Sequence, residues 1–129
     1  MTSETIDRAA SAAEPVLERL VREVHGLSVI QISTSDGYVV AGRTPDRMQA
    51  KKLAAMSASL VALAESLSRE LDTGQPENLV IEAAEGIIVG LRISKHLLLL
   101  ASVRPGTRLG ALLSQTKNAA EEIREALSQ

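Results

Sequence analysis

The chain has 129 residues, enough for one hydrophobic core, whereas two independent cores of half that size would each be marginal. Its net charge is −2, and no long basic run offers a footprint for nucleic acid or an anionic membrane surface. There is no cysteine and Tyr38 is the only aromatic residue, so thiol chemistry and aromatic platforms for base stacking are both excluded.

The N-terminal segment does not have the pattern of a targeting signal. Glu4, Asp7 and Arg8 lie where a signal peptide would have its apolar centre. No apolar run approaches the ~20 residues that span a bilayer. We therefore expect a cytoplasmic protein without membrane insertion, with residues 1–14 as a flexible tail and residues 15–129 as a single domain.

The first predicted elements are one helix and a hairpin. The helix is expected to begin at Pro15, because proline is well tolerated at the first helical position. Two strands follow, over residues 28–33 and 38–42. The dipeptide Asp36-Gly37 between them is a strong hairpin signal.

A long helix is predicted over residues 44–71, with Thr44 as its N-cap and Pro45 at its first position. Its middle, from Leu53 to Ala64, contains no charge, glycine or proline. Large apolar residues recur there at steps of three and four, and small residues occupy the other sides. A chain of this size has little material to cover such a helix twice, so we expect a second chain against it. The stripe consists of Leu53, Met56, Leu60, Leu63 and Leu67.

Three closely spaced strands and a last helix from about Thr107 complete the chain. The short connections imply antiparallel pairing. The continuous apolar runs at 87–89 and 97–100 are typical of strands covered on both faces. The predicted fold is a three-layer α+β sandwich of order α-β-β-α-β-β-β-α, in which helices cover both faces of a mainly antiparallel five-stranded sheet. The three strands are residues 78–83, 86–93 and 96–103.

No residue pattern predicts catalysis or a bound cofactor. His25 and His96 stand 71 positions apart without a neighbouring carboxylate pattern, so no metal site is expected. The sequence has no phosphate-binding loop, dinucleotide-binding loop or nucleophile motif. We expect a protein that is not an enzyme, with no catalytic residues, no metal and no cofactor.

Several segments, in this order, resemble the roadblock / dynein light chain family. Within that family the similarity is to bacterial regulators of Ras-like GTPases, such as the partners of gliding-motility GTPases. The resemblance covers about residues 15–127. The segments are LERLVREVHGLSVIQIS before DGYVVAG, then AKKLAAMSASLVALAESLSREL, then NLVIEAAEGIIVGLRISKHLLLLASV, and finally TRLGALLSQ.

The resemblance implies a homodimer, or a heterodimer with a related chain. In that family the long helices of two protomers pack together, and the strand after the long helix pairs across the two-fold axis. The dimer interface is therefore expected at Leu53, Met56, Ser57, Leu60, Leu63, Ala64, Leu67, Leu79, Val80 and Ile81. Contacts with a further partner are expected on the polar fringe of the helix, at Gln49, Lys52, Ser59 and Glu65.

The function that the resemblance implies is a docking platform for, and regulator of, a small Ras-like GTPase. One alternative is a scaffold or adaptor in a signalling or motor complex, without dependence on nucleotide state. Another is a small-ligand sensor, disfavoured because no polar and aromatic pocket lining is evident. Four arginines near the starts of the later helices are interpreted as surface residues rather than as an arginine finger. They are Arg43, Arg47, Arg104 and Arg108.

Overall fold

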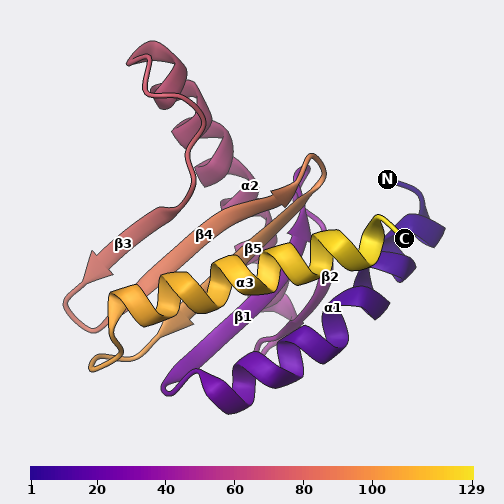
Figure 1. Cartoon of the computed structure of the whole chain (residues 1–129), viewed down its shortest axis with the longest axis horizontal. Coiled ribbons are helices and arrows are strands. Elements are labelled where there is room, and N and C mark those ends of the chain that lie inside the picture. Colours follow the sequence, from indigo (N-terminus) through magenta and orange to yellow (C-terminus); the bar gives the residue numbers. More distant parts are fainter.

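A computed structural model describes the whole chain, residues 1–129, and confirms the predicted element order. Three helices and five strands form an α+β sandwich (Figure 1). In chain order the elements are α1 (Ser3–Glu23), β1 (Leu27–Thr34), β2 (Val39–Arg43), α2 (Arg47–Glu70), β3 (Leu79–Ala83), β4 (Gly86–Ser94), β5 (Leu97–Val103) and α3 (Leu109–Leu127).

The strands form one antiparallel sheet in the order β2-β1-β5-β4-β3. Three neighbouring pairs are hairpins, and the central pair, β1 with β5, joins the two halves of the chain. Strands β2 and β3 form the two edges of the sheet. The long helix α2 connects these two edges in sequence.

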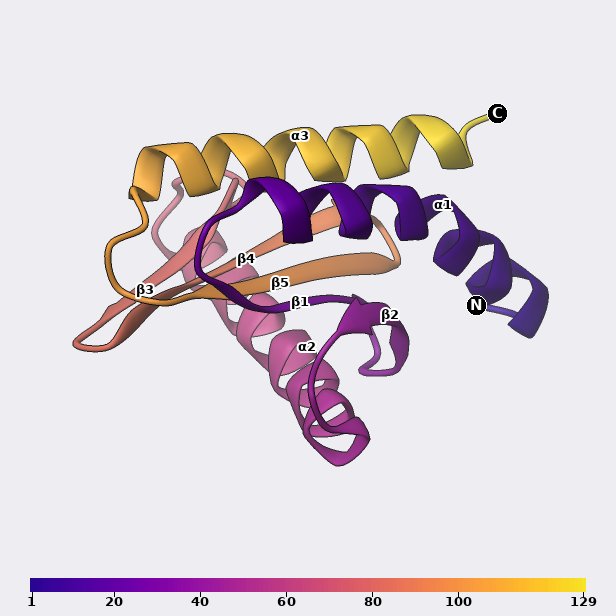
Figure 2. The same cartoon turned by 90° about the horizontal axis from the view of Figure 1, so that it is seen from below.

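The helices cover the two faces of the sheet unequally. Helices α1 and α3 lie side by side on one face, and α2 lies alone on the other (Figure 2). The main core, a cluster of 19 buried hydrophobic residues, lies between the sheet and the α1–α3 pair. In β5, Leu97 and Leu99 belong to this core, whereas Leu98 and Leu100 are buried on the opposite side. The expectation that this strand is covered on both faces is confirmed.

The expected start of the first helix at Pro15 is wrong, because α1 begins at Ser3. Thr2 caps it, with its hydroxyl oxygen accepting from the Thr5 backbone N–H at 3.2 Å. Ala9 and Ala13, placed in a flexible tail by the sequence, are buried in the main core. Pro15 is tolerated inside the helix because it lies on the exposed side, where water can solvate the carbonyl that loses its backbone donor.

The expected cap of the long helix is also wrong. The N-cap is Asp46, whose carboxylate accepts from the Met48 backbone N–H at 3.0 Å. The Thr44 hydroxyl instead donates to Gln31 Oε1 at 3.2 Å, and Gln31 Nε2 donates to the Ala50 carbonyl at 2.9 Å. Gln31 is fully buried, so this polar chain ties β1 to the first turn of α2.

The first prediction tests whether the N-terminal turns of α1 belong to the core. Ala9→Asp should lower the free energy of unfolding by about 2 kcal/mol or more, because it buries a charge without a partner. Ser11→Asp, two residues away on the exposed side of α1, is the matched control and should change it little. Chemical denaturation of both variants measures the difference. Equal stabilities would contradict the packing of these turns.

Candidate interaction surface

Helix α2 places its small residues against its own sheet and its large residues away from it. Ala54, Ser57 and Val61 are its buried residues. Three residues of the predicted apolar stripe point outward instead, because they lie on another side of the helix. Their exposed fractions are 64% for Met56, 68% for Leu63 and 58% for Leu67. The chain itself therefore leaves this stripe uncovered.

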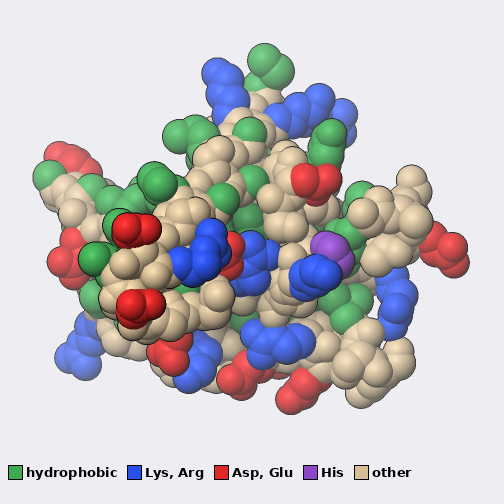
Figure 3. All heavy atoms as spheres, turned by 90° about the horizontal axis from the view of Figure 1, so that it is seen from above, with side chains coloured by type: hydrophobic (Ala, Val, Ile, Leu, Met, Phe, Trp, Pro, Cys, Tyr) green, Lys and Arg blue, Asp and Glu red, His purple; other side chains and the backbone are tan.

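An open apolar groove of about 570 Å³ separates this stripe from the β3 side of the sheet. One wall comes from α2, and the other comes from the β3, β4 and β5 strands through Ile81, Ile88 and Leu100. Figure 3 shows hydrophobic side chains gathered over the half of the molecule that α2 and β3 form. The residues of the helix wall include Leu53, Met56, Leu60 and Leu63.

Strand β3 continues this apolar surface to the edge of the sheet. Val80 is 39% exposed and Ile81 is 42% exposed, and Leu79 is half-buried. No side-chain hydrogen bond reaches the backbone of β3. Because β3 pairs only with β4, its outer row of backbone groups is free to pair with another strand.

The predicted interface residues do not all contribute equally to this surface. Leu53, Leu60 and Ala64 are half-buried. Ser57 is buried at the base of the groove, and its hydroxyl has no hydrogen-bond partner. Ser57 therefore offers almost no surface to a second chain, since its side chain faces the sheet.

Of the polar fringe, three residues are exposed and one is not. Gln49, Lys52 and Ser59 are exposed along α2. Glu65 is half-buried and already paired within the chain, with Arg92 of β4. A role for Glu65 as a free contact for a partner is therefore not supported, because its carboxylate holds α2 to the sheet.

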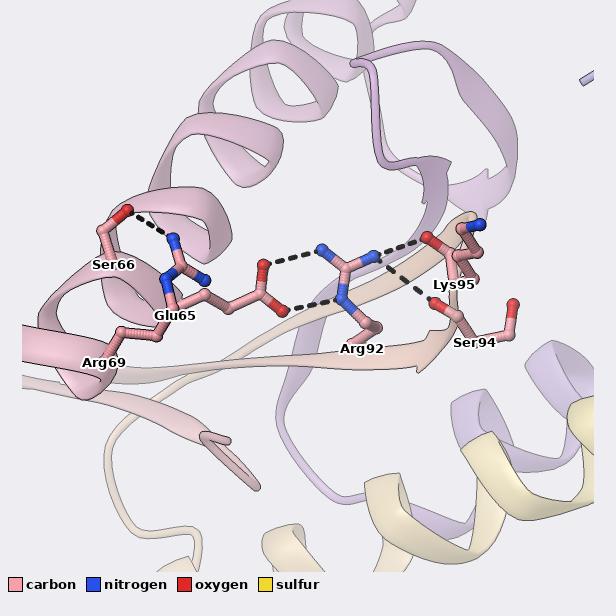
Figure 4. Close-up of polar contacts among 6 residues, drawn as sticks. All are labelled: Glu65, Ser66, Arg69, Arg92, Ser94 and Lys95. Carbon is pink, nitrogen blue, oxygen red and sulfur yellow. Dashed lines mark hydrogen bonds and ion pairs between the residues drawn. The ribbon is translucent and has the colours of Figure 1, made fainter. Parts of the chain in front are cut away.

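The Glu65–Arg92 pair is bidentate, with both nitrogen–oxygen distances 2.9 Å (Figure 4). Arg92 Nη1 also donates to the Lys95 carbonyl at 2.7 Å, so one guanidinium joins α2 to the β4–β5 turn. The hydrogen bonds from Arg92 lower the pKa of the Glu65 carboxyl. The charges of Arg92 and Arg69 act in the same direction, and partial burial opposes them. The role of Arg92 could not be predicted from the sequence, because the two residues are 27 positions apart and no local pattern connects them.

No cluster of three or more histidine, cysteine, aspartate or glutamate side chains in the structure could hold a metal ion. None of the three helices is both long enough and apolar enough to pass through a membrane.

The sequence of this chain matches a known protein family. A family model described as the Roadblock/LC7 domain matches residues 13–102, more than half of the chain. The chain belongs to the Roadblock/LC7 family. A search of curated proteins gave no match.

Solved structures show the same Roadblock/LC7 fold at low sequence identity. A Roadblock/LC7 domain from Streptomyces avermitilis matches with a TM-score of 0.82 at 18% identity, covering 88% of this chain and 96% of that one. MglB from Myxococcus xanthus matches with 0.83 at 18%, covering 92% and 90%. The gliding protein MglB from Thermus thermophilus matches with 0.82 at 21%, covering 93% and 91%. At these identities the likeness shows the fold alone.

The second prediction concerns the ion pair that holds α2 to β4. Because the pKa of Glu65 is lower in the folded chain than its ordinary value of 4.5, the pair stabilises the fold above that value. This stabilisation is lost as the pH falls through the folded pKa. Glu65→Gln should therefore cost about 1 kcal/mol at pH 7, and the difference from the wild type should vanish in more acidic solution.

Urea denaturation at several pH values measures this difference. Glu70→Gln is the control, because Glu70 is exposed and forms no ion pair. A difference between wild type and Glu65→Gln that stays the same at every acidic pH at which the protein is folded would contradict the assignment.

Proposed function

We propose that this Roadblock/LC7 domain is a homodimer assembled through α2 and β3, and that the dimer is a non-enzymatic docking platform for a small Ras-like GTPase. The dimer is supported by one observation: the exposed apolar stripe of α2 is continuous with the unpaired edge of β3. The exposed stripe of α2 and the free edge of β3 meet in one groove, which Ile81, Met56 and Leu60 all line. A second copy related by a two-fold axis would cover both at once.

Association of two copies is energetically favoured over leaving these apolar side chains exposed to water. Full burial of a leucine or methionine side chain is worth about 1.5–3 kcal/mol, and Met56, Leu63 and Leu67 are each more than half exposed. Pairing of β3 with its own copy would also supply partners for its outer backbone groups. An edge of this kind, if it remained free, would be prone to unspecific aggregation.

The GTPase partner is proposed from the family resemblance and supported by the kinship of fold with the MglB gliding proteins. A dimer through α2 would leave Gln49 and Lys52 outside the groove and exposed, whereas Ser59 lines the groove and would be covered. We place the docking contacts at Gln49 and Lys52. Glu65 is left out of this set because Arg92 occupies its carboxylate.

The third prediction tests the dimer. Met56→Glu and Leu63→Glu should each give a folded monomer, because both positions are exposed in the single chain but would bury a charge in the dimer. Ala62→Glu, on an exposed side of α2 outside the groove, is the matched control and should stay dimeric. Light scattering after size exclusion gives the molar mass. A wild-type monomer, or a Leu63→Glu dimer, would overturn the interface.

The fourth prediction tests the partner. The immobilised domain should enrich a Ras-like GTPase from native lysate in the presence of a non-hydrolysable GTP analogue and much less in GDP. Lys52→Glu should reduce the captured amount at least several-fold, whereas Arg22→Glu on the exposed side of α1 should not. Equal capture in both nucleotides would favour a scaffold role. Capture of no GTPase in either condition would overturn the proposed regulation.

A further inference from the structure

The sheet has four stretches of unpaired edge. One is the start of β1, because the β1–β2 register ends with Ile30 opposite Arg43 and β1 begins at Leu27. The other three differ in what binds them. Strands β2 and β3 are the edge strands. In addition, β4 extends past the end of β3, because the β3–β4 register ends with Leu79 opposite Gly90 and β4 continues to Ser94. Any of these stretches could in principle pair with a strand of another molecule.

The β2 edge is occupied by a side chain of its own strand. Arg43 Nη1 donates to the Gly42 carbonyl at 3.0 Å, and Nη2 pairs with Glu14 Oε2 of α1 at 2.7 Å. The hydrogen bonds from Arg43 lower the pKa of Glu14, as expected for an ionised pair. The guanidinium is therefore held at the strand and takes up a backbone acceptor there. From the sequence, Arg43 is expected only to be a surface residue.

Two further features hinder strand addition at β2. The β1–β2 register shifts between Ile32 and Ser33, and such an irregularity twists a strand away from a flat edge. Helix α1 also bends, so that its N-terminal turns extend beyond β2 (Figure 2). Half-buried Val40 and Ala41 pack against the core beneath this helix. Residues 3–12 of α1 precede the part of the chain matched by the family model.

The free end of β4 is also occupied. Arg124 of α3 donates from Nε to the Ile93 carbonyl at 2.7 Å. From the other face of the sheet, Arg92 binds the carbonyl of Lys95, just past the strand, at the same distance. Backbone acceptors at this end of β4 are thus bound by arginines from both faces.

Strand β3 has none of these contacts. No arginine binds its backbone, its register with β4 is regular, and no helix lies along its outer side in Figure 1. We propose that Arg43 and Arg124 close the β2 and β4 edges to strand addition, so that of these three edges only β3 is open to a second copy of this chain. This limit makes self-association end at two copies.

The proposal deepens the dimer described above but can be tested apart from it. A dimer formed through β3 would still carry a β2 edge at each end. If those edges were open, one dimer could bind the next through β2. Contacts at both ends of each dimer would then repeat without forming a closed assembly, and filaments would result. Closing β2 with a charged side chain is a physical means of preventing this.

The experiment is Arg43→Gln in the full chain, with molar mass measured by light scattering over a wide range of protein concentration. Wild type should keep one mass. The variant should form larger species as concentration rises, reaching at least about twice the wild-type mass. Amide hydrogen exchange in β2, residues 39–43, should slow at high concentration if those species form through this edge.

Arg19→Gln is the matched control, because it removes an ion pair of α1, with Glu122 of α3 at 2.6 Å, that touches no strand edge. It should keep the wild-type mass. If Arg43→Gln does not fold, as judged by circular dichroism, Arg43→Met is measured instead. It also removes the guanidinium and its charge from the edge, and it should shift the mass in the same direction.

The double variant Met56→Glu with Arg43→Gln separates the two proposals. If the α2 interface is blocked, association through β2 should still appear above the monomer. An unchanged mass for Arg43→Gln at every concentration, or larger species without slower exchange in β2, would overturn the role of Arg43 at the edge. Neither result would affect the dimer proposed through α2 and β3.

Discussion

The close packing of the small side of α2 on the sheet is the constraint on which the rest of the structure depends. Ala54 and Val61 are buried there, and Ser57 is buried even though its hydroxyl finds no partner. A helix approaches a sheet closely only through small side chains, so the large residues of the same turns are directed elsewhere. The outward position of Met56, Leu63 and Leu67 follows directly. The exposed apolar surface is thus a consequence of how the monomer packs.

Polar ties, more than apolar bulk, orient α2. Its side of the sheet lacks the large core found under α1 and α3. Instead, Gln31 binds the first turn of the helix, and Glu65 binds Arg92 near its other end. Two hydrogen-bonded anchors along one helix restrict both its rotation and its slide over the sheet. They therefore hold the apolar stripe in register with the β3 edge.

Polar ties also act at the edges of the sheet. Arginines bind at the places where backbone groups lack a strand partner, and each also connects two elements of the fold. Arg43 joins β2 to α1, and Arg124 joins α3 to β4. Stabilisation of the monomer and control of what can add to the sheet thus come from the same contacts. The β3 edge differs from the other two because no arginine binds its backbone.

Much of the fold could be predicted from the sequence, because the relevant signals are local. The order of elements, the Asp36-Gly37 turn, the doubly covered β5 strand and the apolar stripe from Leu53 to Leu67 all follow from periodicity and turn chemistry. The start of α1 did not follow, because small residues such as Ala9 and Ala13 acquire their apolar role only when α3 lies against them. Asp46 rather than Thr44 caps α2 for a similar reason, since Gln31 engages Thr44.

Part of the candidate interaction surface could likewise be predicted from the sequence, and part could not. The sequence by itself determined that α2 has two apolar sides and that β3 is an apolar strand. Only the tertiary structure decided which side of α2 meets the sheet, that Ser57 and Glu65 are engaged within the chain, and that Arg43 and Arg124 reach strand edges. Periodicity reports which residues share a side of one element. Contacts between residues tens of positions apart depend on the relative placement of elements, which no local pattern encodes.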